Sequence, residues 1–128
     1  MKNLLFSLVT LMSFSAYAEI TNYDCSKGKS TLRLKVDSET FEVKASSLTL
    51  FDGDTRLTAV IGEQNKDETR KSDIMNRISF KDGSIDSILI TKFPGKPATV
   101  SVYQNADVIE KDNSTIKVVN AGVLMRCK

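Results

Sequence analysis

The chain has 128 residues, with 18 lysines and arginines against 16 aspartates and glutamates, and it contains no histidine and no tryptophan. This near-neutral balance argues against nucleic acid or an anionic membrane as the principal partner. The absence of histidine removes the most frequent general acid–base residue and the most frequent transition-metal ligand. We therefore expect no enzyme, no metal site and no cofactor.

The first 18 residues have the pattern of a cleaved secretory signal. Lys2 is followed by an apolar run over residues 4–14 and by a triplet of alanine, tyrosine and alanine at 16–18. The run is too short for a membrane-spanning helix, which needs about 20 apolar residues. We expect residues 1–18 to be removed and residues 19–128 to form a single β domain that is periplasmic or secreted, with no membrane span.

Two cysteines lie near the two ends of the expected mature chain, Cys25 and Cys127. Thiols pair in an oxidising compartment, and with only two of them there is a single way to pair. The sequence therefore predicts a Cys25–Cys127 disulfide. Closing a loop of about 100 residues stabilises the folded state by at most roughly 4 to 5 kcal/mol.

Alternating apolar and polar residues dominate the chain after the leader. Leu32, Leu34 and Val36 alternate with Arg33 and Lys35, a period of two that is typical of a half-buried strand. Similar segments recur at intervals of roughly 10 residues, which predicts about eight short antiparallel strands. We expect a small meander β-barrel, all-β and closed by the disulfide, with a β-sandwich as the alternative. The first and last strands would be neighbours in such a barrel.

Two aspartate–glycine pairs, Asp52–Gly53 and Asp82–Gly83, are typical of two-residue hairpin turns. Turns at these positions bring large apolar residues together on shared faces. The expected partners across the strands are Leu48 with Leu57, Ser46 with Ala59, Phe80 with Ile85, and Ile78 with Ser87.

Three further segments carry expectations. Residues 64–73 are polar throughout and predict a long mobile loop. Residues 88–90 are apolar at consecutive positions and predict a central strand covered on both faces. Residues 93–97 contain two prolines and a glycine and predict a break between strands. Asp86 is interpreted as part of an exposed strand face.

The candidate binding residues are basic side chains of the first strands and one aromatic residue. A locally positive face could dock an acidic partner, although such a stripe is more often merely a solvated face. Phe93, beside a proline, could anchor a partner or pack against the rim of its own barrel. The candidates are Lys27, Lys29, Arg33, Lys35, Lys44 and Phe93.

The two ends of the expected mature chain resemble the small periplasmic inhibitors of C-type lysozyme. The similarity is carried by Tyr23, Asp24, Cys25, Gly28, the alternating strand at 32–36 and the final Cys127. That resemblance implies a disulfide-closed β-barrel that acts by inserting a loop into another protein. The serine–glycine and tyrosine–threonine–lysine–glycine loop motifs of that family have no counterpart in this sequence.

The sequence therefore favours an exported, non-enzymatic binding or inhibitory module. It would act through a loop or a sheet face on a protein or glycan of the envelope or the extracellular space. The alternative is a lipocalin-like carrier that holds a small apolar ligand inside the barrel. That alternative is motivated by the surplus of aliphatic residues at 88–90.

Overall fold

The structure, a computed structural model, describes residues 19–70, 72–111, 114–119 and 122–128. At residues 70, 106–111 and 114–119 it describes the backbone only. The expected signal sequence, residues 1–18, lies outside the described residues. Within the described part of the chain, no helix is long and apolar enough to cross a membrane.

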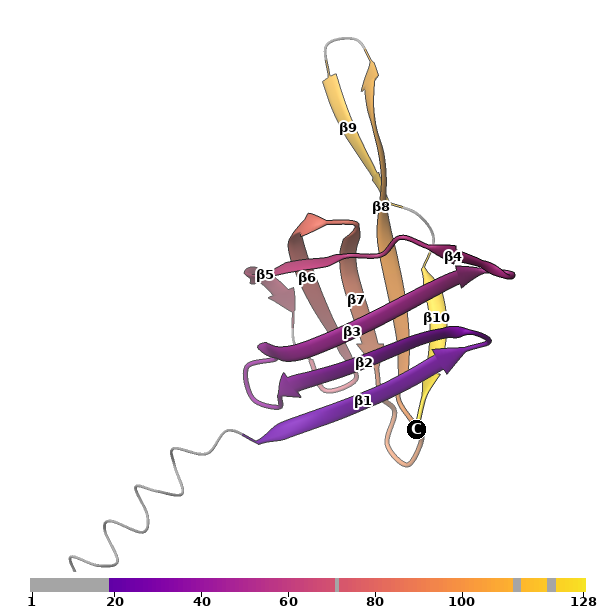
Figure 1. The fold of residues 1–128 in the computed structure, drawn as a ribbon. Helices are drawn as coiled ribbons and strands as arrows, with labels where there is room; N and C mark the ends of the chain where they lie inside the picture. The colour runs from indigo at the N-terminus through magenta and orange to yellow at the C-terminus, as the bar shows by residue number, and fades with distance from the viewer. Residues whose placement is uncertain (1–18, 71, 112–113, 120–121) are drawn as a thin grey trace, which may run out of the picture.

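One antiparallel sheet contains all ten strands of the described residues (Figure 1). Along the sheet the order is β4-β3-β2-β1-β10-β8-β7-β6-β5, and β9 pairs with the far end of β8. The strands are β1 (Ile20–Lys27), β2 (Ser30–Asp37), β3 (Val43–Asp52), β4 (Thr55–Leu57), β5 (Ile61–Arg70), β6 (Met75–Gly83), β7 (Ile85–Thr91), β8 (Thr99–Lys111), β9 (Ser114–Val119) and β10 (Val123–Cys127).

The sheet curls into a half-barrel that does not close. In Figure 1, β1 to β4 cross in front of β5 to β8, and β8 with β9 extends as a long hairpin beyond the rest of the sheet. The all-β antiparallel prediction is confirmed, and so is the adjacency of the first and last strands, β1 and β10. The predicted closure is wrong, because β4 and β5 are the two ends of the strand order and do not pair. Since all the strands belong to one sheet, the two separate sheets of a sandwich are not observed.

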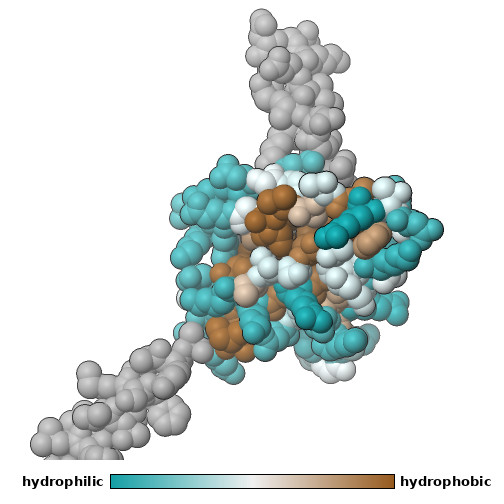
Figure 2. Space-filling model, in the orientation of Figure 1, coloured by the Kyte–Doolittle hydropathy of each residue, from teal (hydrophilic) through white to brown (hydrophobic). Residues whose placement is uncertain are grey.

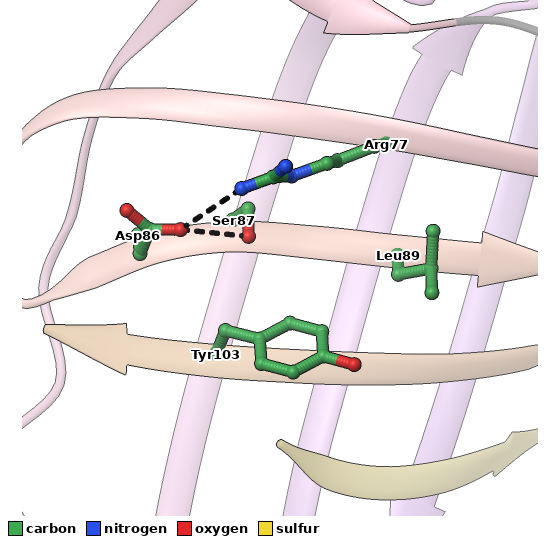
Figure 3. Close-up of a pocket in the computed structure, with 5 residues that line it drawn as sticks. All are labelled: Arg77, Asp86, Ser87, Leu89 and Tyr103. Carbon is green, nitrogen blue, oxygen red and sulfur yellow. Dashed lines mark hydrogen bonds and ion pairs between the residues drawn. The ribbon is translucent and has the colours of Figure 1, made fainter. Parts of the chain in front are cut away.

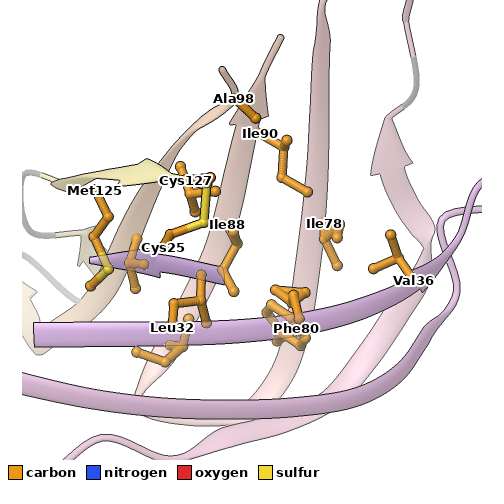
Figure 4. Packing of buried hydrophobic residues seen from close by; sticks show 14 of the residues in the cluster. Cys25, Leu32, Val36, Ile78, Phe80, Ile88, Ile90, Ala98, Met125 and Cys127 are labelled. Atoms are coloured by element: carbon orange, nitrogen blue, oxygen red, sulfur yellow. A yellow bond between two sulfur atoms is a disulfide. The ribbon is translucent and has the colours of Figure 1, made fainter. Parts of the chain in front are cut away.

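The inner face of the curled sheet is filled with aliphatic side chains, as the alternating sequence requires. Leu32 and Val36 of β2 are fully buried, and so are Ile78 of β6 and Ile88 of β7 (Figure 4). Side chains from both halves of the half-barrel therefore form one core. The expectation that residues 88–90 are covered on both faces is only partly met, because Leu89 is half-exposed on the outer face.

The predicted disulfide is present between Cys25 and Cys127, whose Cα atoms are 3.9 Å apart. The two residues lie directly opposite each other in the β1–β10 pair, and both are buried. The backbone N–H of Lys128 donates to the carbonyl oxygen of Asp24 at 2.9 Å, which continues the pairing to the end of the chain. The covalent link thus reinforces the place where the two ends of the chain meet inside the sheet.

Both predicted hairpins form, but their registers differ from the expected ones. In the β3–β4 hairpin Leu50, rather than Leu48, lies opposite Leu57, because the two-residue turn is Gly53–Asp54. This shift by two residues along β3 keeps the same side chains on the inner face. The glycine at φ +61° supplies the left-handed conformation that the first turn position of such a hairpin needs.

In the β6–β7 hairpin the register moves by one residue, which exchanges the faces of one strand relative to the prediction. Ile78 lies opposite Ile88, and Ser79 lies opposite Ser87. Ser79 and its partner Ser87 enclose one residue more than the expected register would, so the turn is longer than a two-residue loop. The longer turn pairs two inward isoleucines instead of an isoleucine with a serine.

The predicted mobile loop over residues 64–73 is wrong, because residues 64–70 belong to β5. This strand is at the edge of the sheet, where charged side chains on both faces remain in water and discourage pairing with other chains. Its pairing with β6 is irregular between Asn65 and Arg70. The hydroxyl of Ser79 donates to the carbonyl oxygen of Glu68 at 3.3 Å and so ties this irregular stretch to β6. A polar sequence can therefore form a strand when its partner strand supplies the apolar face.

Candidate binding surfaces

The basic residues predicted as a binding stripe do not form one surface. Arg33 and Lys35 are exposed together on the outer face of β2. Across the strands they lie opposite Asp24 and Asn22 of β1, and an oxygen of Asp24 is 4.0 Å from the Arg33 guanidinium. The outer face of β2 is therefore a solvated face with a partly compensated charge, which matches the plainer of the two interpretations.

The remaining lysines of that set lie at or next to the ends of strands, and two of them contact acidic neighbours. The Lys29 ammonium is 2.6 Å from Asp54 and 5.9 Å from the centre of the Phe51 ring. At the other end of β3, the Lys44 ammonium is 3.3 Å from Glu42. Lys27 is exposed at the end of β1. These contacts separate the six candidate residues into several places on the molecule.

Phe93, the aromatic candidate, lies in the connection between β7 and β8 and leaves 51% of its surface exposed. Ile74 and Met75 are also exposed, and the backbone N–H of Lys92 donates to the carbonyl oxygen of Ile74 at 2.8 Å. The chain beside Phe93 is thus joined to the start of β6.

A hollow that the sequence did not indicate lies on the outer face of β6, β7 and β8. Its volume is about 290 Å³, and its lining residues are Arg77, Asp86, Ser87, Leu89 and Tyr103. We call it the outer groove. Figure 3 shows the Arg77 side chain reaching along β6 towards Asp86, with Tyr103 on the opposite side of β7. One end of the outer groove is therefore polar, and Leu89 with the Tyr103 ring makes the other end apolar.

A β-bulge assembles the polar end of the outer groove. The register between β7 and β8 is irregular between Ile85 and Ser87, and a bulge of this kind turns consecutive side chains out of strict alternation. Asp86 accepts a hydrogen bond from the Ser87 hydroxyl at 3.0 Å and lies 3.4 Å from an Arg77 nitrogen. The Asp86 side chain is only 15% exposed, so this ion pair is better shielded from water than the others on the surface.

Gly122 supports the apolar end of the outer groove. A side-chain carbon at this glycine would lie 3.0 Å from an edge carbon of the Tyr103 ring. The glycine therefore allows the ring to lie close against the chain that enters β10. A tyrosine held in this way presents a fixed apolar surface with a hydroxyl at its tip.

Three ionisable groups elsewhere have shifted pKa values. Burial against the core raises the pKa of Tyr23. Hydrogen bonds from the backbone of Thr40, and then of Glu39, lower the pKa of Asp37. The hydrogen bond and charge of Lys44, followed by the charge of Lys66, lower the pKa of Glu42. These groups stabilise local structure and lie outside the outer groove.

Among the described residues, the centre of the inner face is filled by side chains. Leu32, Ile78, Ile88, Ile90 and Val102 each have 0% exposure, so no water-sized space borders them. A barrel that carries a ligand needs a hollow interior lined by such residues. The outer face is therefore the better candidate for binding within the described residues.

The sequence carried only a weak signal for the outer groove. Arg77 and Tyr103 are polar members of alternating strands, and nothing in their spacing distinguishes them from ordinary solvent-facing residues. A correct β6–β7 register would have placed Arg77 opposite Leu89, but the bulge that brings Asp86 towards Arg77 depends on tertiary pairing. Among the residues that the structure describes, no three acidic or cysteine side chains gather as a metal site would require.

Comparisons with known proteins found no matching family model, no matching curated protein and no matching solved structure. The similarity of the two chain ends to lysozyme inhibitors therefore remains a resemblance of short motifs.

Proposed function

We propose that this protein is an exported, non-enzymatic binding module that recognises a protein or glycan of the envelope or the extracellular space through the outer groove. The observation that carries the proposal is the combination, in one hollow, of the Tyr103 ring with an Arg77–Asp86 ion pair whose carboxylate is largely shielded from water. Binding sites of this kind pair apolar contact area with a few fixed polar groups that orient the ligand.

The disulfide supports the exported setting, because a small domain with a buried disulfide is compatible with an oxidising compartment. The polar end of the outer groove favours recognition over catalysis. The Ser87 side chain is buried, so its hydroxyl, which donates to the Asp86 carboxylate, has no access to a substrate. A nucleophilic hydroxyl needs an adjacent base and access to its substrate.

The test is a binding screen of the oxidised protein against a glycan array and against envelope proteins, repeated with matched variants. Tyr103→Ala removes the apolar wall of the outer groove, and Arg33→Ala removes an exposed cation on the outer face of β2. We expect a ligand that binds the wild type and Arg33→Ala equally and binds Tyr103→Ala at least tenfold more weakly. Loss of binding in Arg33→Ala alone, or no ligand for the wild type, would overturn the proposal.

A further inference from the structure

The half-barrel fails to close along a narrow border between β3 and the chain that runs from β4 into β5. We call this border the seam and define it by residues 44–49 on one side and 58–63 on the other. In Figure 1 the chain leaving β4 continues alongside β3 towards β5. Leu57 lies opposite Leu50 at one end of the seam, and the side chain of Gln64 contacts Val43 at the other. The two sides thus follow a common antiparallel course without pairing between these ends.

At the end of the seam near Val43, the hydrogen bonds to the β3 side come from the side chain of Gln64 and not from the backbone of a neighbouring strand. The Gln64 amide nitrogen donates to the carbonyl oxygen of Phe41 at 2.9 Å, and its amide oxygen accepts from the backbone N–H of Val43 at 2.8 Å. An amide side chain has the same donor and acceptor as a peptide group. Gln64 therefore occupies the position that one peptide group of an intervening strand would take.

Contacts with β6 and its turn hold the other side of the seam away from β3. The backbone N–H of Ser84 donates to the carbonyl oxygen of Val60 at 2.9 Å, and the Ser84 hydroxyl accepts from the N–H of Val60 at 2.7 Å. A side-chain carbon at Gly62 would lie 2.2 Å from the carbonyl oxygen of Lys81, so only glycine permits this approach. The separation along the seam is therefore built into the packing of β5 on β6.

Two hollows lie along the seam. One, of about 310 Å³, includes Leu48, Arg56 and Ala59 in its lining, and the other, of about 270 Å³, includes Ser46, Ile61 and Glu63. Figure 2 shows apolar surface within a polar surround on the face of the molecule that Figure 1 presents. Every second residue of a strand directs its backbone N–H and C=O groups to the same side. The backbone of Leu50 faces β4, with which it pairs, so the backbone groups of Leu48 and Ser46 face the seam. Residues 43–49 contain no proline, the residue that most directly protects an exposed strand edge.

We propose that the seam is a strand-addition site for an extended peptide segment of a partner protein. The backbone of the peptide would pair with β3 across Ser46 and Leu48, in the manner of peptides that extend a sheet at its edge. Charge complementarity decides which end of an antiparallel peptide is acidic. Exposed Arg56 is at one end of the seam. At the other end exposed Glu63 shares its hollow with Lys44, whose ammonium is already 3.3 Å from Glu42. A peptide antiparallel to β3 therefore places an acidic residue near its N-terminus and a basic residue near its C-terminus.

The proposal is independent of the outer groove, which lies on different strands. It requires the seam to widen to roughly 10 Å, two strand spacings, and the Gln64 amide to be displaced. Gln64 is then an intramolecular competitor of the peptide. Its removal should strengthen binding, whereas a residue with a merely structural role would weaken binding when it is removed.

The test uses a capped seven-residue peptide with glutamate first, lysine last, and valine alternating with threonine between them. Binding to the oxidised protein is measured by fluorescence anisotropy, and the protected amides are located by NMR hydrogen exchange. Two peptides serve as controls, one with lysine and glutamate exchanged and one N-methylated at two alternate central positions. We expect saturable binding, slowed exchange at Ser46 and Leu48, about three- to tenfold weaker binding of the exchanged peptide, and no binding of the N-methylated peptide.

The Gln64→Ala variant, with its fold checked by circular dichroism, should bind the parent peptide at least threefold more tightly. Three outcomes would overturn the proposal. The first is no saturable binding by either protein up to 1 mM peptide, and the second is equal binding of the N-methylated peptide. The third is a dimer that forms with rising protein concentration and slows exchange at Ser46 and Leu48 in the absence of peptide. The last outcome would assign the seam to a second copy of this chain.

Discussion

At the scale of single residues, the connection between β2 and β3 shows how one side chain organises a tight turn. The Asp37 carboxylate accepts hydrogen bonds from the backbone N–H groups of Glu39 at 2.8 Å and Thr40 at 3.1 Å. The backbone N–H of Phe41 then donates to the carbonyl oxygen of Asp37 at 2.8 Å. This turn brings Phe41, at φ +58°, into the core. The carboxylate thus stabilises the conformation that delivers an aromatic side chain to the inner face.

These bonds predict a pH dependence of stability. Because they lower the pKa of Asp37 in the folded protein, its contribution is present above the ordinary carboxyl pKa of about 3.9 and is lost as the pH falls through the lower folded value. Asp37→Asn keeps an oxygen acceptor but cannot titrate. We expect the variant to be less stable than the wild type at pH 7 and the gap to shrink towards pH 3, measured by urea unfolding. A gap that is constant from pH 7 to pH 3 would contradict this account.

At the scale of strands, the position of β5 follows from two glycines that let it approach β6 and its turn. A side-chain carbon at Gly62 would meet the carbonyl oxygens of Lys81 and Asp82, and one at Gly83 would meet the carbonyl oxygen of Val60. All of these are backbone atoms, which cannot move aside independently. The close approach explains why the first half of β5 pairs with β6 and leaves β3 unpaired along the seam.

Gly62→Ala should therefore destabilise the protein by about 1 to 3 kcal/mol, the usual cost of forcing extra atoms into a packed region. Gly53→Ala is the matched control, because no atom lies within 4 Å of its added carbon and only its positive φ opposes the substitution. Urea unfolding should give the larger loss for Gly62→Ala. Equal stability of Gly62→Ala and the wild type would show that the approach of β5 to β6 is not tight.

The strands show what local sequence could and could not predict. Alternation correctly identified β2, and the aspartate–glycine pairs correctly located two hairpins. The register of the second hairpin was missed because the turn takes one extra residue, which no propensity at Asp82 reveals. β5 was missed because its stability comes from β6 and not from an apolar face of its own. The outer groove depends on the β6–β7 register and on the bulge between β7 and β8, so the sequence carried only a weak signal for it.

At the scale of the whole molecule, the disulfide ties together two strands that are far apart in sequence and adjacent in the sheet. Cys25 and Cys127 are separated by 102 residues. Pairing between such distant segments carries a large loop-closure cost that the link removes from the unfolded state. The adjacency of β1 and β10 could be predicted from the cysteines alone. The place where the half-barrel stays open could not, because it depends on how β5 packs against β6.

The double variant Cys25→Ala and Cys127→Ala should lose about 2 to 5 kcal/mol of unfolding free energy. Net stabilities of small domains are about 5 to 15 kcal/mol, so this loss is a large fraction of the net free energy of unfolding. Urea unfolding of the variant and of the oxidised wild type measures the loss. Unfolding of the reduced wild type provides the matched control and should give the same loss. A variant as stable as the oxidised protein would mean that the β1–β10 pairing stands without the link.

The sheet wraps around a filled core yet stays open between β3 and the chain entering β5. Amide hydrogen exchange of the oxidised protein, followed residue by residue, tests this open seam most directly. We predict that the N–H groups of Ser46 and Leu48 exchange at least tenfold faster than those of Ile88 and Val102, which lie in fully paired strands. Equally slow exchange at all four positions would show that the seam is a paired ladder and that the barrel is closed.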